Sequence, residues 1–128
     1  MQLMSRIFVG VIALLLLAIG TRLLFDTSAA MTEVGLATTT ALGISTVRAD
    51  VGGFFMVSGL LALWGAASLN RNVLWPVQLM MACALLGRII TVFVDGAAAA
   101  GVMQMGVELV IIALLQWARA SWPTSPTM

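Results

Sequence analysis

Histidine, tyrosine and lysine are absent from the sequence, and cysteine occurs once, at Cys83. Without histidine, and with a single thiol, the chain has no ligand set for haem, an iron–sulfur cluster or structural zinc, and it has no internal disulfide. A Ser–His–Asp catalytic set is excluded for the same reason. Cys83 lies between two alanines in an apolar run, where a thiol acts as a small hydrophobic side chain. We therefore expect no cofactor, no metal site and no enzymatic activity.

Charged residues are also scarce, at 9% of the chain. All six basic residues are arginines, the acids number five, and the net charge is +1. No basic stripe is present that would hold a phosphate backbone, so we exclude nucleic acid as a partner. Hydrophobic residues make up 62% of the chain, and its mean hydropathy is +1.12. This composition is that of an integral membrane protein.

Four apolar stretches approach the length of about 20 residues that a transmembrane helix needs. Short polar turns join the second stretch to the third, and the third to the fourth, as in antiparallel hairpins. The sequence therefore predicts an all-α, integral membrane four-helix antiparallel bundle that forms one domain over residues 1–128. The predicted helices are 4–25, 49–69, 74–94 and 101–119.

The longest connection, residues 26–47, contains the threonine-rich stretch LATTTALGIST, which is uncharged but too weakly apolar to span. It lies on the membrane surface or enters it as a short helix, and periodicity does not choose between these. Residues 1–30 also have features of a cleaved signal peptide, with a small-residue site at SAA, which would leave three spans. Arg22 interrupts the apolar run before that site, so we favour four spans.

The arginines divide unevenly between the two ends of the predicted bundle. One end holds Arg6, Arg71 and Arg119 with no acid nearby, whereas the other holds the remaining three arginines and all five acids. Short cytoplasmic loops carry the positive excess, so the first end is expected to be cytoplasmic. All four tryptophans fall near that same end, as an interfacial aromatic belt would. Both signals predict an N-in/C-in orientation.

Two charged residues of the predicted helices lie at matching depth. Arg88 is about seven residues before the outer end of the third helix, and Glu108 is about seven residues into the fourth, so both lie about 10 Å below the same surface. A charge at such depth is costly unless it is paired or hydrated. We therefore predict that Arg88 and Glu108 form an ion pair.

Other polar residues gather near the same end. Asp95 follows Arg88 on one helical face, Gln104 and Glu108 share a face at i and i+4, and the second helix begins near Arg48 and Asp50. These residues form a predicted outer polar cluster: Arg48, Asp50, Arg88, Asp95, Gln104 and Glu108. It has three possible roles: an interhelical ion-pair network, a pocket that recognises a small ligand, a lipid headgroup or a quinone, or a path for protons or ions. None of its members is expected to be catalytic.

Glycines and other small residues recur along the predicted second helix. Gly52 and Gly59 are one heptad apart, and Ser58, Ala62 and Ala66 form a small-xxx-small row. Such faces let membrane helices approach closely. We expect contacts within the protein first and an oligomer interface second. The predicted helix-packing glycines are Gly52, Gly53, Gly59, Gly87 and Gly96.

Three stretches resemble a known family. RADVGGFFMVSGLLAL (48–63), LLGRIITVFVDG (85–96) and VELVIIALLQWAR (107–119) are similar to signature stretches of the small bacterial four-helix membrane proteins grouped as domain of unknown function 4345. Members of this family usually have an aromatic residue before the double glycine, whereas this chain has Val51 there. The resemblance implies a multi-pass protein of the bacterial inner membrane and supplies no function. Matching positions are Arg48, Gly52, Gly53, Gly87, Arg88, Asp95, Gly96 and Glu108.

Three functions follow as expectations. The first is a non-enzymatic accessory or scaffolding subunit, in contact with membrane lipids and with other membrane subunits or a second copy of itself. The second is a binder or carrier of a small lipid-soluble ligand, a lipid or a quinone. A fainter likeness to DoxX-like membrane subunits motivates the third, a subunit that takes its redox chemistry from a partner.

Overall fold

The computed structural model describes residues 1–38, 40–96 and 98–123, and every regular element in these ranges is a helix. The all-α class predicted from composition and periodicity is confirmed. The elements are α1 (Gln2–Phe25), α2 (Thr27–Glu33), α3 (Ala41–Thr46), the π-helix η1 (Val47–Gly52), α4 (Gly53–Ser68), the 3-10 helix η2 (Arg71–Val73), α5 (Leu74–Val94) and α6 (Ala99–Ser121).

Four helical segments within the described residues are long and apolar enough to cross a membrane, as expected of a multi-pass membrane protein. The second of them begins well before the predicted residue 49, because α3, η1 and α4 follow one another without a break. Thr40 starts this segment by accepting a hydrogen bond from the Gly43 backbone N–H at 3.0 Å. The segments are Gln2–Phe25, Ala41–Ser68, Arg71–Val94 and Ala99–Ser121.

The connection after α1 is more ordered than a surface loop. It contains α2, whose Ala30 and Met31 are buried beside Leu23 of α1. α2 ends in a turn in which the Leu36 N–H donates to the Met31 carbonyl at 2.7 Å and the Gly35 N–H donates to the Thr32 carbonyl at 3.1 Å. Gly35 has φ +78°, which glycine adopts without strain. This turn holds the residues after α2 against the α1–α4 pair.

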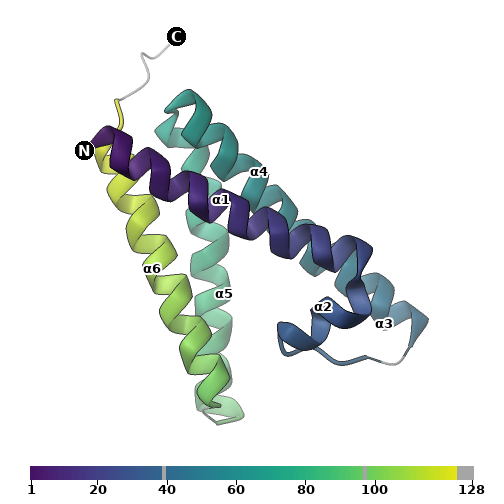
Figure 1. Cartoon of the computed structure of the whole chain (residues 1–128). Helices are drawn as coiled ribbons and strands as arrows, with labels where there is room; N and C mark the ends of the chain where they lie inside the picture. Colours follow the sequence, from purple (N-terminus) through teal and green to yellow (C-terminus); the bar gives the residue numbers. More distant parts are fainter. Residues whose placement is uncertain (39, 97, 124–128) are drawn as a thin grey trace.

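The long helices form two antiparallel pairs, α1 with α4 and α5 with α6 (Figure 1). Each long helix runs opposite to the one before it, so the N-terminus and the end of α6 lie together. From this shared end the two pairs diverge, and α2 and α3 lie at the far end of the α1–α4 pair. The sequence-based bundle is thus two helix pairs that meet at one end and separate toward the other.

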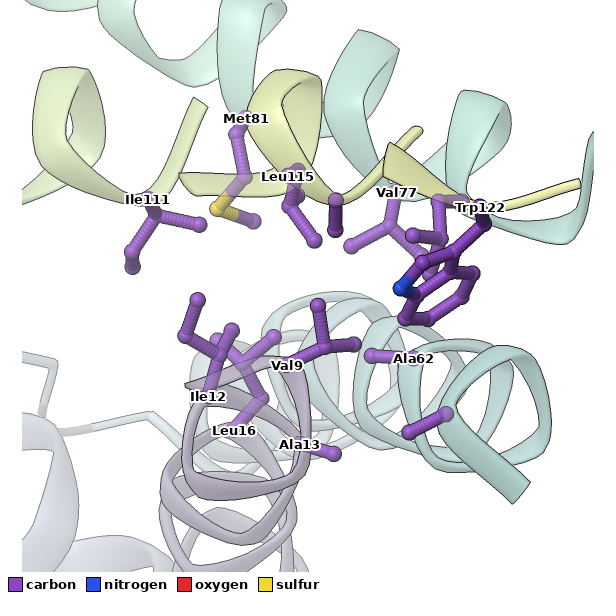
Figure 2. Close-up of a cluster of buried hydrophobic side chains, with 13 residues drawn as sticks. Val9, Ile12, Ala13, Leu16, Ala62, Val77, Met81, Ile111, Leu115 and Trp122 are labelled. Atoms are coloured by element: carbon purple, nitrogen blue, oxygen red, sulfur yellow. The ribbon is translucent and has the colours of Figure 1, made fainter. Parts of the chain in front are cut away.

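The hydrophobic core lies where the two pairs meet. Figure 2 shows Val9, Ile12 and Leu16 of α1 facing side chains of α5 and α6. Opposite them lie Val77 and Met81 of α5, Ile111 and Leu115 of α6, and Trp122 after its end. These side chains are at most 7% exposed, so this end is closely packed.

Trp122 closes this core with a buried hydrogen bond from its indole N–H to Ser5 Oγ at 3.0 Å. We expect Ser5→Ala to lower the free energy of unfolding by about 1–2 kcal/mol, because the indole N–H is left without its acceptor in an apolar environment. Reversible unfolding in detergent micelles measures this change. As a control, Ser68→Ala removes an exposed hydroxyl and is expected to change stability by at most about 0.5 kcal/mol. Equal losses in both variants would show that the Ser5–Trp122 bond adds nothing to stability.

Close contact between α1 and α4 depends on two glycines. A Cβ on Gly59 would lie 2.8 Å from the Leu17 backbone nitrogen, and a Cβ on Gly20 would lie 2.7 Å from that of Met56. Gly52 approaches the side chains of α1 less closely, at 3.3 Å. The packing role predicted for Gly59 and Gly52 therefore agrees with the geometry, and both glycines face a helix of the same chain.

The other predicted packing glycines make no such contact. A Cβ on Gly53 or Gly87 would meet no atom within 4 Å among the described residues. Gly96 has φ +96° and lies in the turn after α5, so its requirement for glycine is conformational. Within the described part of the chain, these three positions therefore have no close packing contact, and their predicted packing role stays a prediction.

Candidate functional site

A cavity of about 470 Å³ lies between the two helix pairs. Its inner end is formed by buried core residues, Leu16, Met81 and Ile111. The turn after α2 contributes to its outer part, and so do Phe54 and Phe55 at the start of α4. The remaining lining residues are Leu15, Ile19, Val34, Gly35, Leu36, Val51, Ala84, Arg88, Gln104, Val107 and Glu108.

Three polar side chains line the cavity from α5 and α6: Arg88, Gln104 and Glu108. Arg88 Nε donates to Glu108 Oε1 at 2.7 Å, so the predicted ion pair is present. Arg88 and Glu108 approach because α5 and α6 are antiparallel neighbours joined by a short turn. The side chain of Glu108 is 11% exposed, whereas that of Arg88 is 35% exposed. The pair therefore has one nearly buried member and one that is about a third exposed.

The ion pair leaves hydrogen-bonding capacity unused. Glu108 Oε2 is buried and has no hydrogen-bond partner among the described residues. The bond that Arg88 makes within the same part of the chain uses Nε, which leaves its two terminal nitrogens for other partners. Buried polar atoms are normally satisfied, and an exception calls for a physical explanation. Glu108 lines the cavity, so a rotation of its carboxylate would turn Oε2 toward a partner placed there.

Arg48 and Asp50 do not join this pair. Arg48 Nε donates to Thr27 Oγ1 at 2.9 Å, which ties η1 to the start of α2. Asp50 is exposed and makes no ion pair among the described residues. Both lie in η1, which continues into α4, and neither lines the cavity.

Asp95 also lies outside the pair, because it follows the last residue of α5 and is exposed. The predicted outer polar cluster is therefore divided. Arg88, Gln104 and Glu108 meet at one cavity, whereas Arg48, Asp50 and Asp95 lie elsewhere.

Two polar arrangements were not predicted from the sequence. Arg22 and Glu33 form a two-bond ion pair at 2.6 and 2.8 Å that links α1 to α2 across an exposed surface. The charges are in the sequence, but the chain reversal between the two helices has no periodic signal. The second arrangement is at the other end, where Arg119 donates to Gln78 at 2.7 Å and stacks 4.8 Å from the centre of the Trp75 ring. The isolated polar residue Gln78 in an apolar span was the sequence feature that indicated a polar partner for Arg119.

Comparison with known proteins adds the family. The family described as domain of unknown function (DUF4345) matches residues 4–119, which include nearly all of the four long helices and every residue that lines the cavity. The chain belongs to this family. Its family description assigns no function to DUF4345 members, and no curated protein and no solved structure matches the chain. For this DUF4345 member, function must therefore be argued from the cavity and its ion pair.

Proposed function

We propose that the protein binds a small lipid-soluble molecule in the cavity between its two helix pairs, without catalysing a reaction. The observation that carries this proposal is an apolar cavity of about 470 Å³ with one polar wall. Small-molecule sites are usually concave, apolar cavities of about 300–1,000 Å³ with a few polar groups that fix orientation. Both the volume and the lining of this cavity match that description.

Charge within an apolar helix supports the same proposal. Arg88 and Glu108 lie in helical segments that are apolar enough to cross a membrane. An ionisable residue at such a position is expensive to bury and marks a functional site by default. An ion pair that served only to fix the helices would gain most from having all its polar atoms satisfied, whereas Glu108 Oε2 has no partner among the described residues.

The proposed setting is the bacterial inner membrane with both termini in the cytoplasm. Arg6, Arg71 and Arg119, with no acid nearby, lie in elements toward the end that the start of α1 shares with the end of α6, which supports this orientation. The cavity then belongs to the outer half of the protein, and its ligand would enter from the outer leaflet.

An accessory role in a membrane complex remains a second proposal. Gly53 and Gly87 leave open surface where a helix of another subunit can approach closely. This role is compatible with a bound ligand.

Filling the cavity tests the binding proposal. Ala84 lines the cavity, so we expect Ala84→Trp to lower the retained amount of the native small molecule at least about tenfold, by occupying its space. The measurement is native mass spectrometry of protein gently extracted from its own membrane, with identification of bound small molecules.

Ala82→Trp is the matched control, because Ala82 is exposed on the same helix and does not line the cavity. It should retain the ligand as the wild type does. Loss from both variants, or from neither, would contradict binding in this cavity. Recovery with a stoichiometric protein partner and no small molecule would favour the accessory role.

A further inference from the structure

We propose that the ligand is an uncharged amphiphile whose polar head carries a hydroxyl group that donates to Glu108 Oε2 and an oxygen that accepts from the Arg88 guanidinium. This inference rests on the proposed function and specifies the chemical class of its ligand. It is carried by the unpartnered oxygen, the composition of the cavity wall and the position of the ion pair.

The charge balance of the cavity sets the charge of the ligand. Arg88 and Glu108 are the charged members of the lining, and they already neutralise each other. An anionic or cationic head would bring a net charge into an apolar cavity with no counter-charge left to meet it. A neutral head avoids this penalty, which disfavours fatty acids and anionic phospholipids and favours alcohols and phenols.

The hydrogen-bonding deficit sets the donor. A carboxylate in an ion pair only accepts hydrogen bonds, so Glu108 Oε2 needs a donor. Among the described residues no donor reaches this buried oxygen. A hydroxyl group of the ligand supplies one when the carboxylate turns toward the cavity, and its hydrogen bond to an ionised acceptor is stronger than a bond between neutral groups.

The other two polar residues set the acceptor. The terminal nitrogens of Arg88 donate only, so they call for an oxygen on the ligand next to the hydroxyl group. Gln104 can either donate to that oxygen or accept from a second hydroxyl. A head group with two adjacent oxygen atoms, at least one of them in a hydroxyl group, can hydrogen-bond to all three polar residues of the cavity.

The apolar body of the ligand then extends inward. Leu16, Met81 and Ile111 form the inner end of the cavity, and the flexible Met81 can adapt to the shape of a chain or a ring. The edge-to-face rings of Phe54 and Phe55, 5.2 Å apart, line another side. An acyl glycerol and an alkyl hydroquinone share this chemistry and differ in their bodies.

Matched pairs of probes test the inference. The protein is placed in dioleoylphosphatidylcholine nanodiscs, whose lipid lacks hydroxyl donors. Equilibrium binding is measured for 1-monooleoylglycerol and for decylhydroquinone, each beside its own dimethyl ether, and for oleate. We expect at least one hydroxyl-bearing probe to bind at least about tenfold tighter than its dimethyl ether and than oleate, because the ethers lack the donor and oleate adds a charge.

Glu108→Gln identifies the bond. It should weaken the favoured hydroxyl probe about tenfold and leave its dimethyl ether unchanged, since the ether makes no bond to Oε2. Circular dichroism and the thermal midpoint check that the variant is folded. If Glu108→Gln does not fold, the inference is tested by the ratio of the affinities of the hydroxyl probe and its dimethyl ether. This ratio should be large in the wild type, and the preference should disappear in Ala84→Trp.

The outcomes separate this inference from the proposed function. The hydroxyl inference would be overturned if each probe bound as tightly as its ether, or if oleate bound most tightly. If that binding were also lost in Ala84→Trp, the cavity would still be a binding site. If no probe binds but the extracted protein retains a small molecule that Ala84→Trp loses, the head-group inference fails alone. If no probe binds and nothing is retained, both fail.

Discussion

Leucine in place of Gly20 is expected to prevent the folded protein from accumulating, and alanine is expected to lower the free energy of unfolding by about 1–3 kcal/mol. A Cβ at this position would lie 2.7 Å from the Met56 backbone nitrogen and 3.1 Å from its Cα. Backbone atoms of a neighbouring helix cannot rotate aside as a side chain can, so α1 and α4 must separate. Reversible unfolding in detergent micelles, followed by circular dichroism, measures the loss.

Gly10→Ala is the matched control on the same helix. A Cβ on Gly10 meets no atom within 4 Å among the described residues. Alanine favours a helix interior over glycine by up to about 1 kcal/mol, so this variant should be unchanged or slightly more stable. Changes of opposite sign in the free energy of unfolding at these two glycines would separate the effect of packing from that of helix propensity. Equal effects at Gly10 and Gly20 would mean that the α1–α4 contact does not need a glycine.

The glycines show what a sequence pattern can and cannot predict. Heptad spacing placed Gly52 and Gly59 on one face of a helix, and that face does pack on α1. Nothing in the sequence separated Gly87 from them, although a Cβ there would meet no atom within 4 Å among the described residues. Spacing fixes which residues share a face, whereas the direction of that face depends on where the other helices lie.

The helices themselves were largely predictable, because a long apolar run has few alternatives to a membrane helix. The early start of the second span at Ala41 was not predicted, since its first residues, ALGIST, include glycine, isoleucine, serine and threonine, which have a lower helix propensity than alanine. A single threonine cap and continuity with α4 stabilise it instead. Local propensity was overridden by the structure that follows.

The candidate site was half predictable for a related reason. Depth along the helices brought Arg88 and Glu108 together correctly, because neighbouring antiparallel helices share their ends. The start of the second predicted helix also placed Arg48 at this end, but its Nε donates to Thr27 instead. Residue spacing gives the position of a side chain along its helix. It does not give the lateral distance between helices, which the divergence of the two helix pairs increases. The cavity results from that divergence.

Arg88→Leu is expected to lower the free energy of unfolding by about 3 kcal/mol, the lower end of the range for breaking a buried ion pair, because Arg88 itself is about a third exposed. The loss comes from Glu108, whose nearly buried carboxylate is left without its counter-charge. Reversible unfolding in micelles gives the value. Arg22→Leu is the control, since it breaks an ion pair whose two side chains are more than half exposed, and it should unfold close to the wild type.

The double variant Arg88→Leu, Glu108→Leu separates stability from binding. Removing both charges eliminates the unpaired carboxylate, so most of the lost stability should return, with a coupling energy of about 1–3 kcal/mol between the two sites. Retention of the native ligand should not return, because both polar partners of its head are gone. If retention recovers along with stability, the ion pair serves only to hold α5 to α6, and the ligand is recognised by the apolar walls alone. If the double variant does not recover stability, the cavity needs both charges to keep its shape. Ligand retention is then measured in Glu108→Gln instead.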